Sequence, residues 1–369
     1  MNKLTRIQLS GFKSIREMDF ILSSLNVLIG ANGAGKSNFL SFFRLLNHIM
    51  TGWLQGHIET KGGANAHLYY GTKRTPQMEC TLHFDTDSGS NIYYMRLIHA
   101  SGDRLIFADE KISYTRKNSQ SQAPLLSLGG GHKETMLLSE DLNGSLKKTA
   151  RTIRDLMNFW RFYQFHDTSD TANIKMPALI DDNRYLRADA GNIAAYLYFL
   201  KQKYEKHYKL IVTTIRQIAP FFDDFILLPS RLNPNQIKLQ WKEKAPDSIF
   251  EVNQLSDGTL RMIALITLLL QPQLPPLIVI DEPELGLHPY ALQILASLLK
   301  SAAEKSQLIV STQSVSLVDA LEPEDLVVVN RKDGQSVFER LSEEKLTDWL
   351  QEYTYMEAFR PPFVYPSNR

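Results

Sequence analysis

The feature that most constrains the fold is a glycine-rich loop between an apolar strand and an apolar helix. The loop, Gly30–Ser37, matches G-x-x-x-x-G-K-[ST] without a gap. The short run Leu25–Ile29 precedes it and predicts a strand. Apolar residues recur after it at helical spacing, at Phe39, Phe42, Phe43 and Leu46. A strand, a glycine turn and a helix in this order predict a phosphate-binding loop in an α/β fold.

Each position of the loop has an expected task. The glycines let backbone N–H groups turn inward around a phosphate, and the helix N-terminus adds a favourable dipole. We expect Lys36 to reach the β- and γ-phosphates and act in catalysis, and the Ser37 hydroxyl to ligate Mg²⁺. The other predicted nucleotide-binding residues are Asn32, Gly33, Gly35 and Asn38. The alternative is a turn that only connects strand to helix.

A second apolar run, Leu277–Ile280, ends in two carboxylates, Asp281 and Glu282. A buried parallel strand that ends in acid places this charge at the carboxyl edge of the sheet, where ligands bind. We expect Asp281 to hold Mg²⁺ and Glu282 to act as general base toward water. The alternative for either acid alone is a solvated polar turn.

Leu255–Thr259 reads in isolation as a helix start capped by Ser256 or Asp257. Its place just before the acidic strand completes an ordered set of motifs. With Ile7–Phe12, the loop, Phe165–Ser169 and Asp281–Pro289, it resembles the RecF/SMC/OLD-like branch of ABC ATPases, specifically the small head-only ATPases of bacteria. The ending Leu287-His288-Pro289 is typical of chromosome-maintenance and defence ATPases rather than transporters.

The resemblance implies a P-loop NTPase of ABC type that binds ATP and Mg²⁺. It also implies that Ser256, Asp257 and Gly258 act in trans, completing the nucleotide site of a second copy. Two-fold symmetry would then give two composite sites in a homodimer, or more in a higher oligomer.

One position departs from the family pattern, and no motif marks the family's glutamine loop. The residue after the last core strand, usually histidine, is Gln313, which can hydrogen-bond a γ-phosphate or orient water but carries no positive charge. We predict that it takes part in catalysis and that turnover is slow. The Mg²⁺-contacting glutamine is assigned to Gln164, after the strand-like Trp160–Tyr163; the alternative is a strand-end glutamine in solvent.

The middle of the chain predicts one amphipathic helix of roughly seven turns over 193–218, packed as core rather than extended as a coiled-coil arm. Four lysines near it, at 201, 203, 206 and 209, either contact nucleic-acid phosphates or form a solvated face. Gln236–Lys242 alternates as one strand. The polar stretch at Gly129–Gly131 is predicted to be mobile.

These patterns predict an N-terminal β-rich lobe at 1–165 with the phosphate loop, a helical insertion at 166–250, and a C-terminal α/β lobe at 251–369. The 56 residues after Gln313 (369 − 313) include a predicted hairpin over 326–338 and are too few for the nuclease domain of some family members. A separate effector protein is therefore expected.

Composition limits the remaining classes. The chain carries 41 basic and 40 acidic residues, so no global basic field draws it onto nucleic acid. A single cysteine, Cys80, excludes an intrachain disulfide. The sequence shows neither a signal peptide nor a membrane-length apolar run, so we expect a cytoplasmic protein. We predict an ATP-hydrolysing switch for a partner in DNA repair or antiphage defence; the alternative is a RecF-like ATPase acting directly on DNA or RNA.

Overall fold

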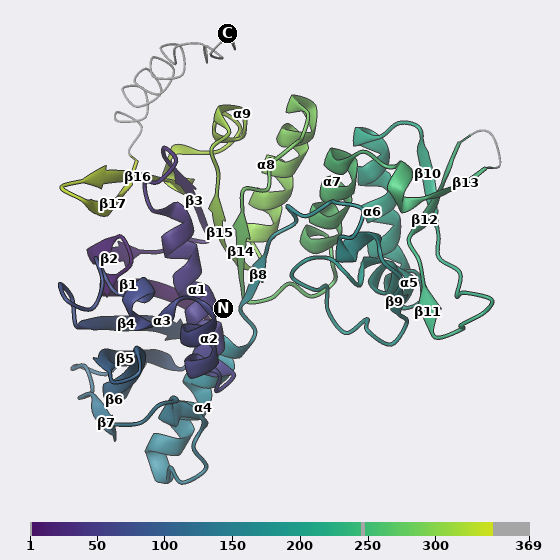
Figure 1. Cartoon of the computed structure of the whole chain (residues 1–369). Coiled ribbons are helices and arrows are strands. Elements are labelled where there is room, and N and C mark those ends of the chain that lie inside the picture. The colour runs from purple at the N-terminus through teal and green to yellow at the C-terminus, as the bar shows by residue number, and fades with distance from the viewer. Residues whose placement is uncertain (1, 245–247, 342–369) are drawn as a thin grey trace.

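The computed structural model describes residues 2–244 and 248–341. In this part of the chain, the central element is a six-stranded sheet of order β17-β16-β3-β15-β14-β8 (Figure 1). Pairing is parallel from β16 through β8, and β17 adds an antiparallel edge. The strands are β3 (Leu25–Ile29), β8 (Arg161–Tyr163), β14 (Leu277–Asp281), β15 (Gln307–Ser311), β16 (Leu326–Lys332) and β17 (Gln335–Arg340).

Alternate side chains of this sheet enter two different cores. Along β14, Ile278 and Ile280 pack in one apolar cluster, whereas Leu277 and Val279 pack in the other. A strand that is buried on both faces is expected to be apolar, as β14 is in its first four residues, Leu277–Ile280. Helix α1 (Lys36–Met50) lies on one side of the sheet, and α7 (Asp257–Leu269) and α8 (Pro289–Ala303) lie on the other (Figure 1).

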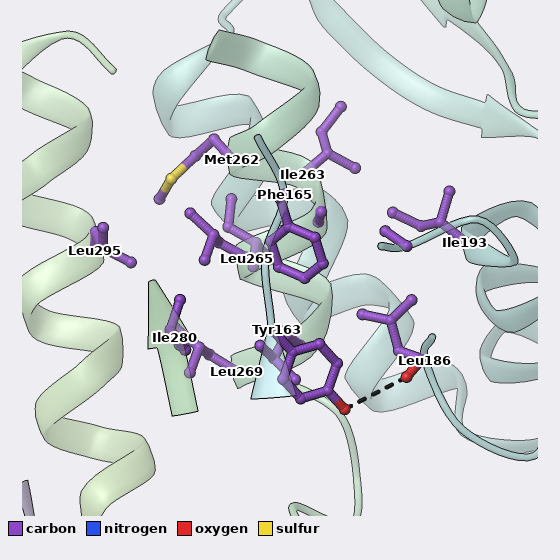
Figure 2. Close-up of a cluster of buried hydrophobic side chains, with 14 of the residues drawn as sticks. Tyr163, Phe165, Leu186, Ile193, Met262, Ile263, Leu265, Leu269, Ile280 and Leu295 are labelled. Carbon is purple, nitrogen blue, oxygen red and sulfur yellow. Dashed lines mark hydrogen bonds between the residues drawn. The ribbon is translucent and has the colours of Figure 1, made fainter. Parts of the chain in front are cut away.

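The core on the α7 side joins the predicted lobes. Figure 2 shows side chains of α7, such as Leu265 and Leu269, between Ile280 of the sheet and Tyr163 and Phe165 of the segment that begins with β8. The Tyr163 hydroxyl also donates to the Leu186 carbonyl at 3.4 Å. The segment that contains Gln164 is therefore anchored in the same core as α7. This helix begins within Leu255–Thr259, which we call the signature segment, and we refer to α7 as the signature helix.

The second sheet is antiparallel, with order β2-β1-β4-β5-β6-β7. Its strands are β1 (Lys3–Phe12), β2 (Ile15–Ile21), β4 (Gln77–Thr86), β5 (Gly89–Ala100), β6 (Arg104–Arg116) and β7 (Leu126–Gly129). One face packs on α1, where Phe39, Phe42 and Phe43 are buried. Gly129 ends the edge strand and Gly131 N–H donates to Phe107 O at 2.7 Å, so Gly129–Gly131 lies paired along β6, and its mobility stays a prediction.

Three further helices lie beside α1. They are α2 (Leu54–Thr60), α3 (Gly63–His67) and α4 (Gly144–Asn158). The first two fall within 51–124, where the sequence pattern predicts β structure. They are too short for an apolar periodicity to stand out, which is why the pattern misses them.

The helical lobe differs from prediction in two places. The expected single helix is broken at Tyr204 into α5 (Ile193–Lys203) and α6 (Glu205–Ile218). The backbone of Tyr204 leaves helical geometry, with φ −135° and ψ 52°, so the apolar stripe continues while the axis does not. Apart from Tyr204, which is exposed, and Ile218, which is partly buried, the stripe is buried, as predicted for core packing.

The predicted strand over 236–242 is also divided. Its start is β11 (Gln236–Ile237), which pairs with β9 (Ala178–Leu179), and its end is β12 (Gln240–Glu243), which lies between β10 (Phe222–Ile226) and β13 (Ile249–Glu251). The hairpin of β16 and β17 is confirmed, and the short α9 (Val315–Val318) precedes it. In the described residues, no helix has the length and apolar character that a membrane span requires.

Candidate nucleotide-binding site

The phosphate loop begins at the carboxyl end of β3, and its lysine turns back onto the loop. The Lys36 side chain donates to the carbonyls of Gly30 and Ala31, the second at 3.2 Å. Lys36 is only 5% exposed, and burial lowers the pKa of its ammonium, with the charges of Glu282, Glu284 and Asp281 acting in the opposite direction. A buried cation whose partners are backbone carbonyls is well suited to exchange them for an anion.

A chain of hydrogen bonds through one amide and two hydroxyls connects the phosphate loop to β17. The Asn38 side chain donates to Ser14 Oγ at 2.8 Å, Ser14 Oγ lies 2.7 Å from Ser336 Oγ, and Ser336 donates to the Ala34 carbonyl at 2.6 Å. Gly35 has φ 118°, and a Cβ there would lie 1.9 Å from Ser336 Oγ. Glycine is therefore required at 35 by both conformation and space. Asn38 supports the loop, and its contact with a nucleotide stays a prediction.

The acidic pair follows β14 at the same edge of the sheet. Asp281 is buried, and its carboxylate accepts a hydrogen bond from Ser311, which ends the neighbouring strand β15. Glu282 has φ 43°, a left-handed conformation that is uncommon outside glycine, and its N–H donates to Ser311 O at 2.9 Å. This turn directs the two carboxylates differently, and such conformations cluster at functional sites.

Gln313 lies next to Glu282, a contact that the sequence did not predict. Its side-chain amide donates to Glu282 Oε1, and its backbone N–H donates to Glu284 Oε1 at 2.7 Å. The strands that carry the loop, the acids and Gln313 are adjacent in the sheet, in the order β3, β15, β14. Three motifs that are far apart in the sequence thus converge at one edge.

Gln164 lies beside the acidic strand rather than in bulk solvent. Its amide nitrogen is 3.1 Å from His166 Nδ1, and His166 Nε2 is 2.9 Å from the Asp281 carbonyl oxygen. Its oxygen accepts from Arg44 at 2.7 Å, and the guanidinium of Arg44 also lies over the Phe162 ring, 3.8 Å from the centroid. The position is suitable for a metal-contacting glutamine, and that role stays a prediction.

The signature segment presents an exposed helix N-terminus. Ser256 caps α7, its Oγ accepting from the Thr259 N–H at 3.2 Å, and Ser256 and Asp257 are exposed. Gly258 is close-packed, because a Cβ there would lie 2.3 Å from the Gly286 carbonyl oxygen. The start of α7 is therefore held against the segment that follows the acidic pair.

Arg261, on the same helix, connects three segments of the site and was not predicted from the sequence. Its guanidinium donates to the carbonyls of Phe165, His166 and Leu285 at 3.2, 2.9 and 3.0 Å, and to Thr168 Oγ1 at 3.1 Å. It ties the signature helix to the Gln164 segment and to the segment after Glu284. An arginine five residues after Ser256 is a weak signal, because its acceptors are mostly backbone carbonyls.

Tyr70 and Arg331 flank the loop and were also missed. The Arg331 guanidinium donates to the Gly33 carbonyl at 3.5 Å and to the Tyr70 hydroxyl at 3.2 Å. Tyr70 is half-exposed, and Arg74 lies over its ring at 5.0 Å. Both residues come from segments whose position beside the loop depends on the tertiary fold.

The donor set fits a nucleotide with Mg²⁺. Mg²⁺ is usually held by one or two protein oxygens together with phosphate and water oxygens. The exposed Ser37 hydroxyl on the first turn of α1, the Asp281 carboxylate and the Gln164 amide are oxygen donors of this kind. In residues 2–244 and 248–341, His, Cys, Asp and Glu form no group of three or more that could hold a metal by themselves. Bound Mg²⁺ would neutralise phosphate charge beside Lys36.

The fold is a P-loop ATPase fold of the SMC-head type. The structure of an SMC head bound to the C-winged helix domain of ScpA matches it with a TM-score of 0.61 and 18% identity, over 93% of this chain and 99% of that chain. An SMC head with an extended coiled coil, bound to the C-terminal domain of ScpA and derived from Pyrococcus furiosus, matches with a TM-score of 0.56 and 17% identity, over 96% and 100%. At such identities the likeness shows the fold alone.

The chain belongs to the family described as "AAA domain, putative AbiEii toxin, Type IV TA system", whose model matches residues 25–319. The head-only ATPase of the SMC/RecF/ABC-like branch that the motifs predict is thereby confirmed, as is the α/β fold. No curated protein sequence matches the chain.

Proposed function

We propose that this chain binds and hydrolyses ATP with Mg²⁺ and that ATP closes two copies head to tail. The observation that carries the proposal is the convergence of Lys36, Asp281 and Glu282 at one sheet edge, with Gln313 in contact with the proposed general base. Catalysis in such sites is mainly positioning and electrostatic stabilisation of a phosphoryl group. Lys36 would bind phosphate, and Glu282 would accept a proton from water.

The head-to-tail part rests on the signature segment. Ser256 presents its hydroxyl at an exposed helix N-terminus, a favourable place for an anionic γ-phosphate from a second copy. Asp257 and Gly258 are the other residues proposed to act in trans. Hydrolysis removes the γ-phosphate and with it the link between the copies.

A mixing experiment tests this arrangement. Lys36→Ala removes the phosphate contact of one site, and Ser256→Arg blocks the signature offered to the other. Each variant should be inactive by itself. Their equimolar mixture should recover about a quarter of the wild-type rate, because half the dimers are mixed and each mixed dimer keeps one intact composite site. A mixture as inactive as its components would contradict sharing in trans.

The biological output proposed is a conformational signal to a separate protein in antiphage defence or DNA repair. The family description, which names a toxin system, supports the first, and the SMC head structures bound to ScpA support partner binding by this fold. Purification of tagged chain with ATP and with ADP, from cells that express the neighbouring genes, tests it. The proposal expects a companion protein that is retained in one nucleotide state only.

Direct action on nucleic acid is the weaker candidate. Of the four lysines near α5 and α6, Lys201 pairs with Asp224 at 3.2 Å and Lys209 pairs with Glu205 at 2.6 Å. Such pairing lowers the net positive field available to phosphates. ATP-dependent retention of labelled duplex DNA or RNA at physiological salt would favour this candidate over the signalling role.

A further inference from the structure

Gln313 bridges two glutamates of different surroundings. Its side-chain amide contacts Glu282, the proposed general base, and its backbone N–H contacts Glu284. The backbone contact with Glu284 fixes the position of Gln313, whereas the side-chain contact with Glu282 involves its proposed catalytic group. Glu284 lies three positions after Asp281 and has no part in the roles assigned above.

Glu284 accepts a hydrogen bond from the first backbone N–H after β15 that no longer pairs with β3. Thr312, just before Gln313, still donates its N–H to the Leu28 carbonyl of β3 at 3.0 Å. The next N–H, that of Gln313, instead reaches Glu284 Oε1 at 2.7 Å. The side chain of Glu284 thus replaces the strand partner that the end of β3 no longer offers, and it fixes the residue that carries the catalytic amide.

Glu284 is held in surroundings that are costly for a carboxyl group. Burial raises its pKa, with hydrogen bonds from Gln313 and Thr312 acting in the opposite direction. Among the described residues, its Oε2 is buried and has no hydrogen-bond partner. A buried carboxylate oxygen without a protein hydrogen-bond partner calls for an explanation.

We propose that Glu284 is a positioning residue for hydrolysis: through Oε1 it fixes the backbone of Gln313, so that the Gln313 amide can orient Glu282 and the attacking water. This role deepens the proposed ATPase function and rests on it. Glu284 acts through Gln313 and touches no reacting atom. The segment that follows Glu284 also contacts the signature helix, through Leu285 and Gly286. A movement of that helix on closure with a second copy would therefore reach the Glu284–Gln313 hydrogen bond.

Three substitutions separate positioning from other roles. Glu284→Gln keeps an acceptor of the same length, so kcat should stay within about threefold of wild type. Glu284→Ala removes the acceptor and should lower kcat about tenfold with ATP affinity unchanged. Glu284→Asp, one methylene shorter, should behave like the alanine variant. A matched control is Glu110→Gln, another buried glutamate that accepts a backbone N–H, from Met136 at 2.8 Å, in the other sheet; kcat per folded molecule should not change.

A double-mutant cycle with Gln313→Ala gives the decisive readout. If Glu284 acts through Gln313, the double variant should be no slower than Gln313→Ala alone. Multiplying effects would overturn the proposal, as would a Glu284→Gln variant that loses activity as completely as a general-base variant. Normal kcat in Glu284→Ala would also overturn it.

Backbone hydrogen exchange keeps this test separate from the ATPase proposal. The peptide that contains the Gln313 N–H should exchange faster in Glu284→Ala than in wild type, and at the wild-type rate in Glu284→Gln. If the wild-type chain hydrolyses no ATP, the proposed function fails. The exchange rate at Gln313 would still show whether Glu284 fixes the Gln313 backbone. If hydrolysis is normal and exchange at Gln313 is unchanged in Glu284→Ala, only the positioning role fails.

Discussion

The side-chain amide of Gln313 donates a hydrogen bond to Oε1 of Glu282, so a residue just after β15 directly contacts the carboxylate proposed to activate water. An amide can orient this carboxylate and a γ-phosphate, but it cannot supply the positive charge of a histidine. The contact therefore favours a site in which positioning rather than charge is the task of this residue.

Removal of this amide should slow hydrolysis without weakening nucleotide binding. For Gln313→Ala we expect kcat about tenfold lower, because one oriented hydrogen bond in a catalytic site contributes about 1–3 kcal/mol. Steady-state hydrolysis combined with binding of a fluorescent ATP analogue separates the two effects. A loss of affinity with normal kcat would show instead that Gln313 serves ground-state binding.

Substitution of Arg261 should uncouple the signature helix from the site. Arg261→Met removes the guanidinium that bridges the Phe165 and His166 carbonyls to that of Leu285. We expect nucleotide affinity to be retained and ATP-dependent dimerisation to be weakened at least about tenfold. Arg261→Lys should not rescue it, because a single ammonium cannot reproduce the fork of contacts. Rescue by lysine would mean that the charge alone is needed.

A histidine cluster at the C-terminal end of α1 predicts a loss of stability in acid. His57 stacks on His48 with ring centroids 4.3 Å apart and lies near His67. Burial, followed by the charges of these neighbours, lowers the pKa of His57 from 6.5 to about 3. Below pH 6.5 the unfolded chain therefore binds a proton that the folded chain rejects, and the free energy of unfolding falls as pH falls toward 3.

His57→Phe tests the source of this slope while keeping an aromatic ring in the cluster. Between pH 6.5 and pH 4.5 the wild type should lose about 1 kcal/mol per pH unit more than the variant, measured by urea unfolding. Equal slopes would mean that other groups set the acid limit. Above pH 7 the two proteins should show parallel pH dependence.

The local motifs were predictable because the conformation of each one depends on residues that are close together in the sequence. The Gly30–Ser37 loop, the apolar strand before Asp281 and the cap at Ser256 all lie where the spacing placed them. Their convergence was predictable as well, because parallel strands align their carboxyl ends.

The supporting contacts were not predictable in this way. Arg261 binds backbone carbonyls, and Glu284 binds a backbone N–H, so no side-chain pattern records either contact. The break at Tyr204 was missed for a related reason. The apolar spacing predicts which face of the helical segment is buried. One non-helical residue, Tyr204, turns the helix axis but leaves that spacing unchanged, so the sequence pattern does not reveal the break.

The central claim, ATP-driven closure of two copies, is tested most directly by the mass of Glu282→Gln in solution. This variant keeps the phosphate and metal ligands but lacks the general base, so ATP should bind and remain intact. Light scattering should give a monomer without nucleotide or with ADP and twice that mass with ATP and Mg²⁺. An unchanged mass at saturating ATP, with binding confirmed in the same sample, would contradict the head-to-tail account.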